Sequence, residues 1–184
     1  MDRDIALARS VVDDDKDINA VGYHLQNACI SLLAQQAPMA GDLRVIVSVT
    51  AIMSDLERMG DLAVNIVERA LSLIAQPPVK PLIDMPRLGQ LAESMVRNCL
   101  DAFVRRDAEL ARSVLLSDDA VDDLRDSIYQ ELIHYMEKDP TTISRALDLL
   151  FIARNLERLG DHATNIAEDV IYALTGRDIR HGHS

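Results

Sequence analysis

The chain has 184 residues, a length that suits one domain of ordinary size or two small bundles with a shared interface. Apolar residues make up 48% of it, with no Trp, two Phe and four Tyr, and this composition favours close-packed helices over a sandwich or a barrel. The formal net charge of −11 argues against nucleic acid as a partner, because binding phosphate groups needs a basic surface. The charge fits a soluble protein, a cation binder, or a protein whose partner carries a basic patch.

The N-terminal segment MDRDIALARSVVDDDKD lacks the basic start and the apolar run of a signal peptide. No segment reaches ~18 uninterrupted apolar residues, so we expect no direct insertion into a membrane. Cys29 and Cys99 lie within apolar helical patterns and show no CxxC spacing, which indicates two free core thiols. These features together predict a cytoplasmic protein.

Apolar residues recur at three- and four-residue spacings over long stretches, and no alternating strand pattern appears. Turn residues at 38–41 and 139–142 and a proline-rich segment at 77–81 interrupt the pattern, and Gly176 is placed to end the last helix. We therefore predict an all-α fold. The expected helices cover about 3–36, 42–75, 86–106, 107–137 and 141–175, with a tight corner near 106–107.

An internal repeat divides the chain. The segment LERMGD returns as LERLGD one hundred residues later, and nine of the fifteen positions in 54–68 are identical in 154–168. Upstream, LARSV at 7–11 returns at 110–114. A repeated helical hairpin predicts two antiparallel helical bundles. The expected parts are a first repeat at 1–76, a linker at 77–85, a second repeat at 86–176 and a tail at 177–184.

The two repeats differ at their start. A full predicted helix, 86–106, precedes the second LARSV, but only six residues precede the first. We therefore expect a three-helix bundle in the second repeat and a truncated hairpin, without its N-terminal helix, in the first. A hairpin leaves an apolar stripe uncovered, and an exposed stripe of that size marks an interaction surface. Whether the chain starts late or another subunit covers the stripe, we expect self-association.

Each copy of the motif places a Glu and an Asp four residues apart on one helix face, as Glu57 with Asp61 and as Glu157 with Asp161. Like charges at this spacing destabilise a helix by a few tenths of a kcal/mol. The glycine between them costs ~1 kcal/mol relative to alanine inside a helix. A glycine kept in both copies suggests that another helix or a bound ion approaches the backbone closely.

The helix before each motif supplies a second polar pair at the same spacing. Alignment through LARSV matches Asp15 with Asp118 and Asn19 with Asp122. In an antiparallel hairpin these side chains face the next helix, and four hard oxygen donors from two helices resemble carboxylate metal sites in helical bundles. The second site gathers Asp118, Asp122, Glu157 and Asp161, and the first gathers Asp15, Asn19, Glu57 and Asp61. Because Asn19 is neutral, we expect the first site to bind metal more weakly.

Two other interpretations remain open. In the first, Arg58 and Arg158 neutralise the acids as structural ion pairs, and the chain is a metal-free helical adaptor. The second is a carboxylate-bridged di-metal enzyme, but Glu131 and His134 form a single E-x-x-H where a ferritin-like site needs two. No phosphate-binding loop and no nucleophile–base arrangement appears, so we predict no enzymatic activity. We expect His162 to be a polar residue on the helix surface.

The motifs carry a family resemblance that covers essentially the whole chain. LERMGDLAVNI and LERLGDHATNIAE, each with an E-x-x-x-D, resemble the PhoU family of phosphate-uptake regulators, as do QAPMAGDLR, the LARSV segments and the ending YALTGRDIRH. The resemblance implies two similar three-helix bundles that bind multinuclear metal clusters, with iron, zinc or manganese as candidate ions. Carried over residue by residue, the motif ligands are Glu57, Asp61, Glu157 and Asp161. The spacing alone adds Asp15, Asp118 and Asp122.

The same resemblance implies a function. PhoU proteins act in the cytoplasm as negative regulators of the phosphate-starvation response, and they are thought to couple the phosphate ABC transporter to a sensor histidine kinase. They commonly dimerise, so we expect a homodimer with the transporter ATPase and the kinase as partners. In this interpretation metal offsets the repulsion between carboxylates and holds each hairpin together.

Overall fold

The structure, a computed structural model, describes residues 5–81 and 83–180, and in this part of the chain all regular elements are helices and no strand occurs. The predicted all-α fold is therefore confirmed. Residues 1–4 of the first repeat and 181–184 of the tail lie outside the described residues. No helix in the described part is long and apolar enough to cross a membrane. The helices are α1 (Ile5–Gln36), α2 (Gly41–Ile74), α3 (Asp84–Arg105), α4 (Ala108–Leu115), α5 (Asp118–Lys138) and α6 (Ile143–Thr175), with a 3-10 turn at Pro140–Thr142.

The corner predicted near 106–107 is confirmed, but the single helix predicted over 107–137 is wrong. Asp107 caps α4, because its side chain accepts hydrogen bonds from the backbone N–H groups of Glu109 and Leu110, both at 3.0 Å. A second break separates α4 from α5, where the Ser117 hydroxyl donates to a backbone carbonyl one turn earlier. The buried residues Val114 and Val121 lie seven positions apart, so the apolar pattern continues across this break and hides it.

Two local predictions are also confirmed. Gly176 follows α6 in a left-handed conformation with φ 73°, and its N–H donates to the Tyr172 carbonyl at 2.8 Å. Cys29 and Cys99 are buried free thiols. Burial raises the pKa of the Cys99 thiol to about 12, which keeps it protonated and unreactive.

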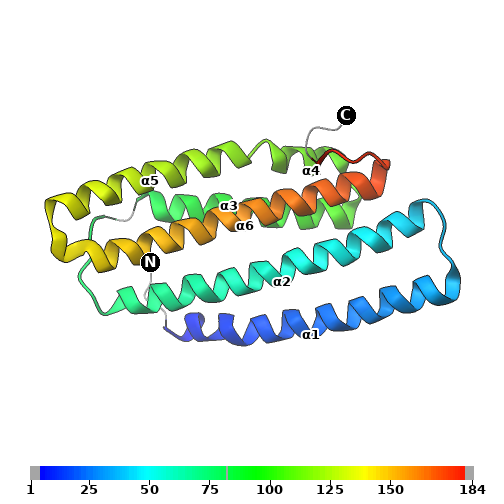
Figure 1. The fold of residues 1–184 in the computed structure, drawn as a ribbon, viewed down its shortest axis with the longest axis horizontal. Coiled ribbons are helices and arrows are strands. Elements are labelled where there is room, and N and C mark those ends of the chain that lie inside the picture. The colour runs from blue at the N-terminus through cyan, green and yellow to red at the C-terminus, as the bar shows by residue number, and fades with distance from the viewer. Residues whose placement is uncertain (1–4, 82, 181–184) are drawn as a thin grey trace.

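The two repeats meet along one pair of helices. Figure 1 shows α1 and α2 as an antiparallel hairpin on one side, and α3, α4, α5 and α6 as a bundle on the other. In the middle, α2 and α6 run antiparallel and pack against each other. Arg69 of α2 pairs with Asp148 of α6 at 3.3 Å, and Asp55 of α2 contacts His162 of α6 at 2.7 Å. These contacts place the two LER-x-GD motifs beside each other near the centre of the molecule.

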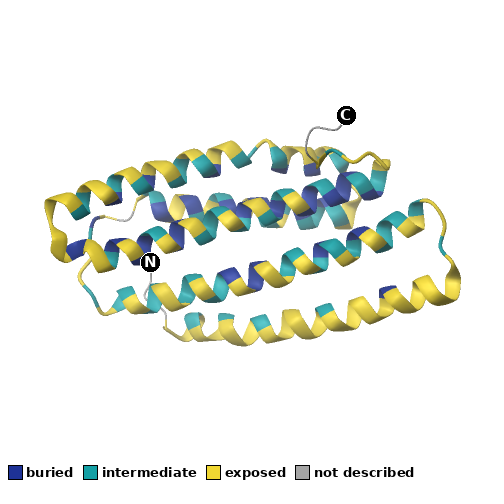
Figure 2. Cartoon of the chain, viewed as in Figure 1, coloured by how far each residue is buried: buried dark blue, intermediate teal, exposed yellow. Residues whose placement is uncertain are grey.

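Burial differs sharply between the repeats. Among the described residues of α1, Cys29 alone is buried, and Figure 2 shows the rest of that helix exposed along most of its length. The predicted exposed apolar stripe is therefore present. Its large exposed side chains on α1 are Ile5, Leu7, Val12, Ile18, Val21, Tyr23, Leu25, Ile30, Leu32 and Leu33. Most of the buried core lies in the second repeat, where α3 covers the other helices.

Candidate metal centres

The second repeat brings four carboxylates together, and we call them the second acidic site: Asp118 and Asp122 from α5, and Glu157 and Asp161 from α6. Partial burial raises the pKa of Glu157, and the nearby Asp161 raises it further. Burial also raises the pKa of Asp161, with Asp122 as the next cause, and that of Asp118, with Asp161 as the next cause. These effects indicate that the acids of α5 and α6 lie on facing sides of the two helices, but no three of the described side chains are grouped closely enough to hold an ion.

Arg125 neutralises part of this site. It lies on α5 one turn after Asp122, and its guanidinium contacts Glu157 of α6 and lies 3.2 Å from Asp122 Oδ1. It also pairs with Asp126 at 2.9 Å. The alternative interpretation had Arg58 and Arg158 neutralise the motif acids. Arg58 does lie 3.9 Å from Asp61 in the first repeat, whereas in the second repeat the ion pair of Glu157 comes from Arg125 on the neighbouring helix. The i,i+3 spacing from Asp122 to Arg125 was the signal that sequence analysis passed over.

The first repeat contains the matching set, Asp15, Asn19, Glu57 and Asp61, which we call the first acidic site. Asn19 Nδ2 donates to Asp15 Oδ2 at 3.2 Å within α1. The other oxygen of Asp15, Oδ1, is buried and has no hydrogen-bond partner. That oxygen lies against the backbone of Gly60, where a Cβ atom would overlap it. The predicted close approach to this glycine is therefore confirmed, and the approaching group is a carboxylate.

A cavity of about 420 Å³ lies beside the first acidic site, between α1 and α2. Asn19, Gly22 and Glu57 are among the residues that line it. Gly22 is the counterpart of Arg125 in the alignment through LARSV, so the first repeat has open space where the second has a guanidinium.

The residues of both sites fit a hard metal ion in their chemistry. They offer carboxylate oxygens, which suit manganese and iron, and the buried Asp15 Oδ1 lacks the cation or donor that such an atom needs. Across residues 5–81 and 83–180, however, no three His, Cys, Asp or Glu side chains are grouped closely enough to hold an ion. Metal binding at Glu57, Asp61, Glu157 and Asp161, and at the added Asp15, Asp118 and Asp122, thus requires these side chains to turn inwards and stays a prediction.

His162 is not the surface residue that we expected. Its side chain is 16% exposed, and Nδ1 lies 2.7 Å from Asp55 Oδ1 across the boundary between the repeats. Asn165 Nδ2 is 3.4 Å from the same oxygen. The counterpart of His162 in the first motif is the buried Leu62, which was a signal that this position faces inwards.

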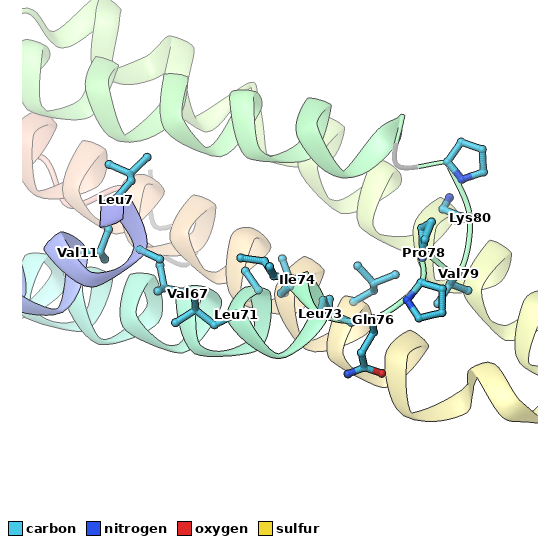
Figure 3. A pocket seen from close by; sticks show the side chains of 16 residues that line it. Leu7, Val11, Val67, Leu71, Leu73, Ile74, Gln76, Pro78, Val79 and Lys80 are labelled. Carbon is cyan, nitrogen blue, oxygen red and sulfur yellow. The ribbon is translucent and has the colours of Figure 1, made fainter. Parts of the chain in front are cut away.

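A second feature is an apolar groove of about 930 Å³ on the open side of the first repeat. Figure 3 shows Leu7 and Val11 of α1 near Val67 and Leu71 of α2, with Lys80 of the linker at the far end. The residues that line the groove are Leu7, Ala8, Val11, Val67, Ala70, Leu71, Leu73, Ile74, Gln76, Pro77, Pro78, Val79, Lys80, Pro81, Leu149 and Ile152. In the second repeat, α3 packs against α4, α5 and α6 and covers the matching face.

Comparison with known proteins identifies the family. The PhoU domain matches residues 1–70 and 85–170. A phosphate-specific transport system accessory protein PhoU homolog from Pseudomonas aeruginosa is 41% identical over 182 residues, which cover 98% of this chain and 75% of the relative. The crystal structure of PhoU from Pseudomonas aeruginosa superimposes with a TM-score of 0.91 at 40% identity, over 96% of this chain and 85% of that one.

A second solved structure, the phosphate transport system regulatory protein PhoU from Streptococcus pneumoniae, has a TM-score of 0.86 at 30% identity. It covers 96% of this chain and 83% of its own. The doubled motif, the two helical repeats and these likenesses agree, and the chain belongs to the PhoU family.

Proposed function

We propose that this protein is a metal-binding, non-enzymatic regulator of phosphate uptake. The observation that supports the proposal is that acids of α5 and of the motif on α6 lie near one another, since Arg125 contacts both Asp122 and Glu157, while the first repeat contains a buried, unpartnered Asp15 oxygen. The names of its relatives, an accessory and a regulatory protein of phosphate transport, supply the biological setting.

The proposed cofactor is a multinuclear cluster of iron, zinc or manganese in each acidic site. Asp15, Glu57 and Asp61 would hold the ion between α1 and α2, and Asp118, Asp122, Glu157 and Asp161 would hold it between α5 and α6. The positive charge would offset the repulsion between these carboxylates and so stabilise each hairpin.

The proposed partners are the ATPase of the phosphate ABC transporter and a sensor histidine kinase, both reached from the cytoplasm. The protein acts as a negative regulator that keeps the phosphate-starvation response off while phosphate is plentiful. A starvation-response reporter tests this role in a bacterial strain that lacks its own PhoU. We expect the unaltered chain to repress the reporter at high phosphate and a Glu157→Ala, Asp161→Ala variant, checked for folding by circular dichroism, to release it. Full repression by that variant contradicts a regulatory role for the metal.

We also propose that the protein forms a homodimer through the open face of the first repeat. The apolar groove and the exposed stripe on α1 support this, since contiguous apolar surface of this extent favours association. Leu7→Asp places a charge in the groove, and Val104→Asp places one at an apolar position on α3 that is also exposed, 79% against 64% for Leu7. We expect sedimentation to show that Leu7→Asp weakens self-association and Val104→Asp does not. Equal behaviour of the two variants contradicts this interface.

A metal-free helical adaptor is the second candidate, and Arg125 favours it. This arginine pairs with both Glu157 and Asp122 in the second repeat. If ion pairs alone hold the repeats, the unfolding free energy is the same in excess chelator as in excess metal. A rise in stability on adding metal therefore selects the metal-binding regulator.

A further inference from the structure

We propose that the cavity between α1 and α2 binds a small organic cation that carries a guanidinium group, such as an alkylguanidinium. The cavity has a volume of about 420 Å³, which lies in the size range of small-molecule sites. This inference goes beyond the proposed metal binding and does not depend on it. Its basis is the second repeat, which carries a guanidinium of its own at the matching place.

The second repeat shows how such a hairpin holds a guanidinium. That of Arg125 contacts Glu157 on the neighbouring helix α6, and it lies 3.2 Å from Asp122 and 2.9 Å from Asp126 on its own helix. The Arg125 side chain is only 21% exposed, so it is largely shielded from bulk solvent. Three carboxylates around one planar cation provide acceptors for several of its five N–H groups.

In the first repeat the arginine is replaced by glycine, and the residues that would surround it line one cavity. Alignment of the two copies matches Arg125 with Gly22. The same alignment gives the counterparts of the three acids, in the order used above, as Glu57, Asn19 and Tyr23. Gly22 and all three of these counterparts line the cavity. The cavity therefore lies where the second repeat places the Arg125 side chain.

Other exchanges between the repeats enlarge the same space. Three further lining residues are smaller than their counterparts in the second repeat: Ser54 replaces Arg154, Cys29 replaces Leu132 and Thr50 replaces Leu150. Met53, whose counterpart is the smaller Ala153, fills part of the space beside Gly22. The volume that remains suits a ligand about as large as a long side chain.

The charge of the lining fits a monovalent cation. Glu57 is the one charged residue among the described residues that line the cavity. Its carboxylate forms no ion pair or hydrogen bond within the described part of the chain, and the motif arginine, Arg58, lies 3.9 Å from Asp61 instead. One carboxylate balances one positive charge, and a guanidinium can bind it through two parallel N–H groups.

The neutral lining residues fit the other features of a guanidinium. Asn19 donates its Nδ2 to Asp15, which leaves its carbonyl oxygen as an acceptor. Gln26 supplies a second amide to the lining, and Tyr23 supplies an aromatic ring. A guanidinium has N–H groups for amide oxygens and a flat face that stacks on aromatic rings, whereas an ammonium lacks the flat face. The lining therefore favours a guanidinium over other small cations.

The test titrates ¹⁵N-labelled protein with n-propylguanidinium in chelator, with the backbone amide signals of α1 followed by nuclear magnetic resonance. Two compounds of similar size serve as comparisons. One is n-propylurea, which keeps the shape but not the charge, and the other is n-butylammonium, which keeps the charge but not the planar donors. We expect saturable binding of n-propylguanidinium that shifts the Gly22 amide signal. Each comparison compound should bind at least roughly tenfold more weakly.

Two substitutions locate the site. Glu57→Gln removes the charge but keeps the size of the side chain, and we expect it to weaken binding by roughly tenfold or more. Gly22→Arg gives the first repeat a guanidinium of its own, as Arg125 does in the second, and we expect it to abolish binding of the probe. A side chain can start at this position, because a Cβ at Gly22 would meet only the flexible end of Met53 at 3.1 Å.

The outcomes decide the inference separately from the metal proposal, because every titration is made in chelator. No saturable binding, equal binding of either comparison compound, or full binding by Glu57→Gln overturns the inference. Selective binding that Glu57→Gln weakens and Gly22→Arg abolishes supports it, provided that Glu93→Gln, which alters a glutamate paired with Arg97 on α3, has no effect. If Gly22→Arg does not fold, Glu57→Gln decides alone, since Glu57 is exposed and has no partner to lose within the described residues.

Discussion

The first and second repeats share a helical hairpin and a motif, yet they bury their matching residues to very different extents. Ile128 of α5 is 1% exposed under the cover of α3, whereas its counterpart Leu25 of α1 is 40% exposed. The sequence at these positions is apolar in both copies, so the third helix decides which of them become core. A repeated pattern therefore predicts the hairpin but not its burial.

The surroundings of the motif glycine also differ between the two repeats. Gly160 faces Val121 and Met95, and a Cβ there would make an ordinary contact at 3.5 Å with Val121 Cγ1. Gly60 faces the Asp15 carboxylate, and a Cβ there would overlap it. In the second repeat α3 supplies Met95 to this spot, while in the first repeat an acidic side chain lies against the helix. The same residue in the motif thus serves apolar packing in one copy and a polar contact in the other.

Replacing the matched apolar residues Ile128 and Leu25 with alanine tests the difference in burial between the repeats, and it should give the largest effect. We expect Ile128→Ala to lower the unfolding free energy by about 2–5 kcal/mol, because it leaves a cavity in a covered core. Leu25→Ala should cost less than about 1 kcal/mol, since that side chain is half in solvent. Urea unfolding at a protein concentration where the chain is monomeric measures both. Equal losses would mean that the first repeat is packed as tightly as the second.

The pH dependence of stability tests the same difference in burial at Asp169. The counterpart of Asp169 in the first repeat, Arg69, is exposed. Asp169 is buried, and desolvation raises its pKa to about 6 although Arg180 lies 3.5 Å away. A carboxyl whose folded pKa lies above its unfolded value of 3.8 favours the folded state at acidic pH, and this contribution is lost as pH rises to about 6. Relative to wild type, Asp169→Asn should therefore gain stability between pH 4 and 7, by up to about 3 kcal/mol. A stability difference that stays flat or falls over this range rules out an unfavourable buried charge.

Alanine at the two motif glycines gives the smallest expected effect. Gly160→Ala should raise the unfolding free energy by up to about 1 kcal/mol, because alanine favours the helix and the added methyl meets only ordinary contacts. Gly60→Ala should not raise the unfolding free energy, because the Asp15 carboxylate has to move away to make room for the methyl group. Thermal unfolding in chelator compares the two variants without metal. An equal gain in both would show that Asp15 does not press on Gly60 in solution.

Sequence analysis predicted the all-α fold, the repeat and most of the helices, because all of these follow from spacing along one helix or from alignment of the copies. It missed the break after α4, since Val114 and Val121 keep the apolar period across it. It misplaced His162 and overlooked Arg125, because their contacts depend on how two helices approach each other. Periodicity within one helix does not specify which residues of a neighbour it will meet.

The measurement that tests the central claim most directly is metal content per chain by elemental mass spectrometry, on protein purified without an affinity tag or chelator. Wild type is compared with Glu57→Ala, Asp61→Ala protein and with Glu157→Ala, Asp161→Ala protein. We expect iron, zinc or manganese at more than one ion per chain in wild type, and a loss of metal in each variant. Metal-free wild type that is equally stable with and without these acids would contradict the account and would leave ion pairs such as those of Arg125 to hold the repeats.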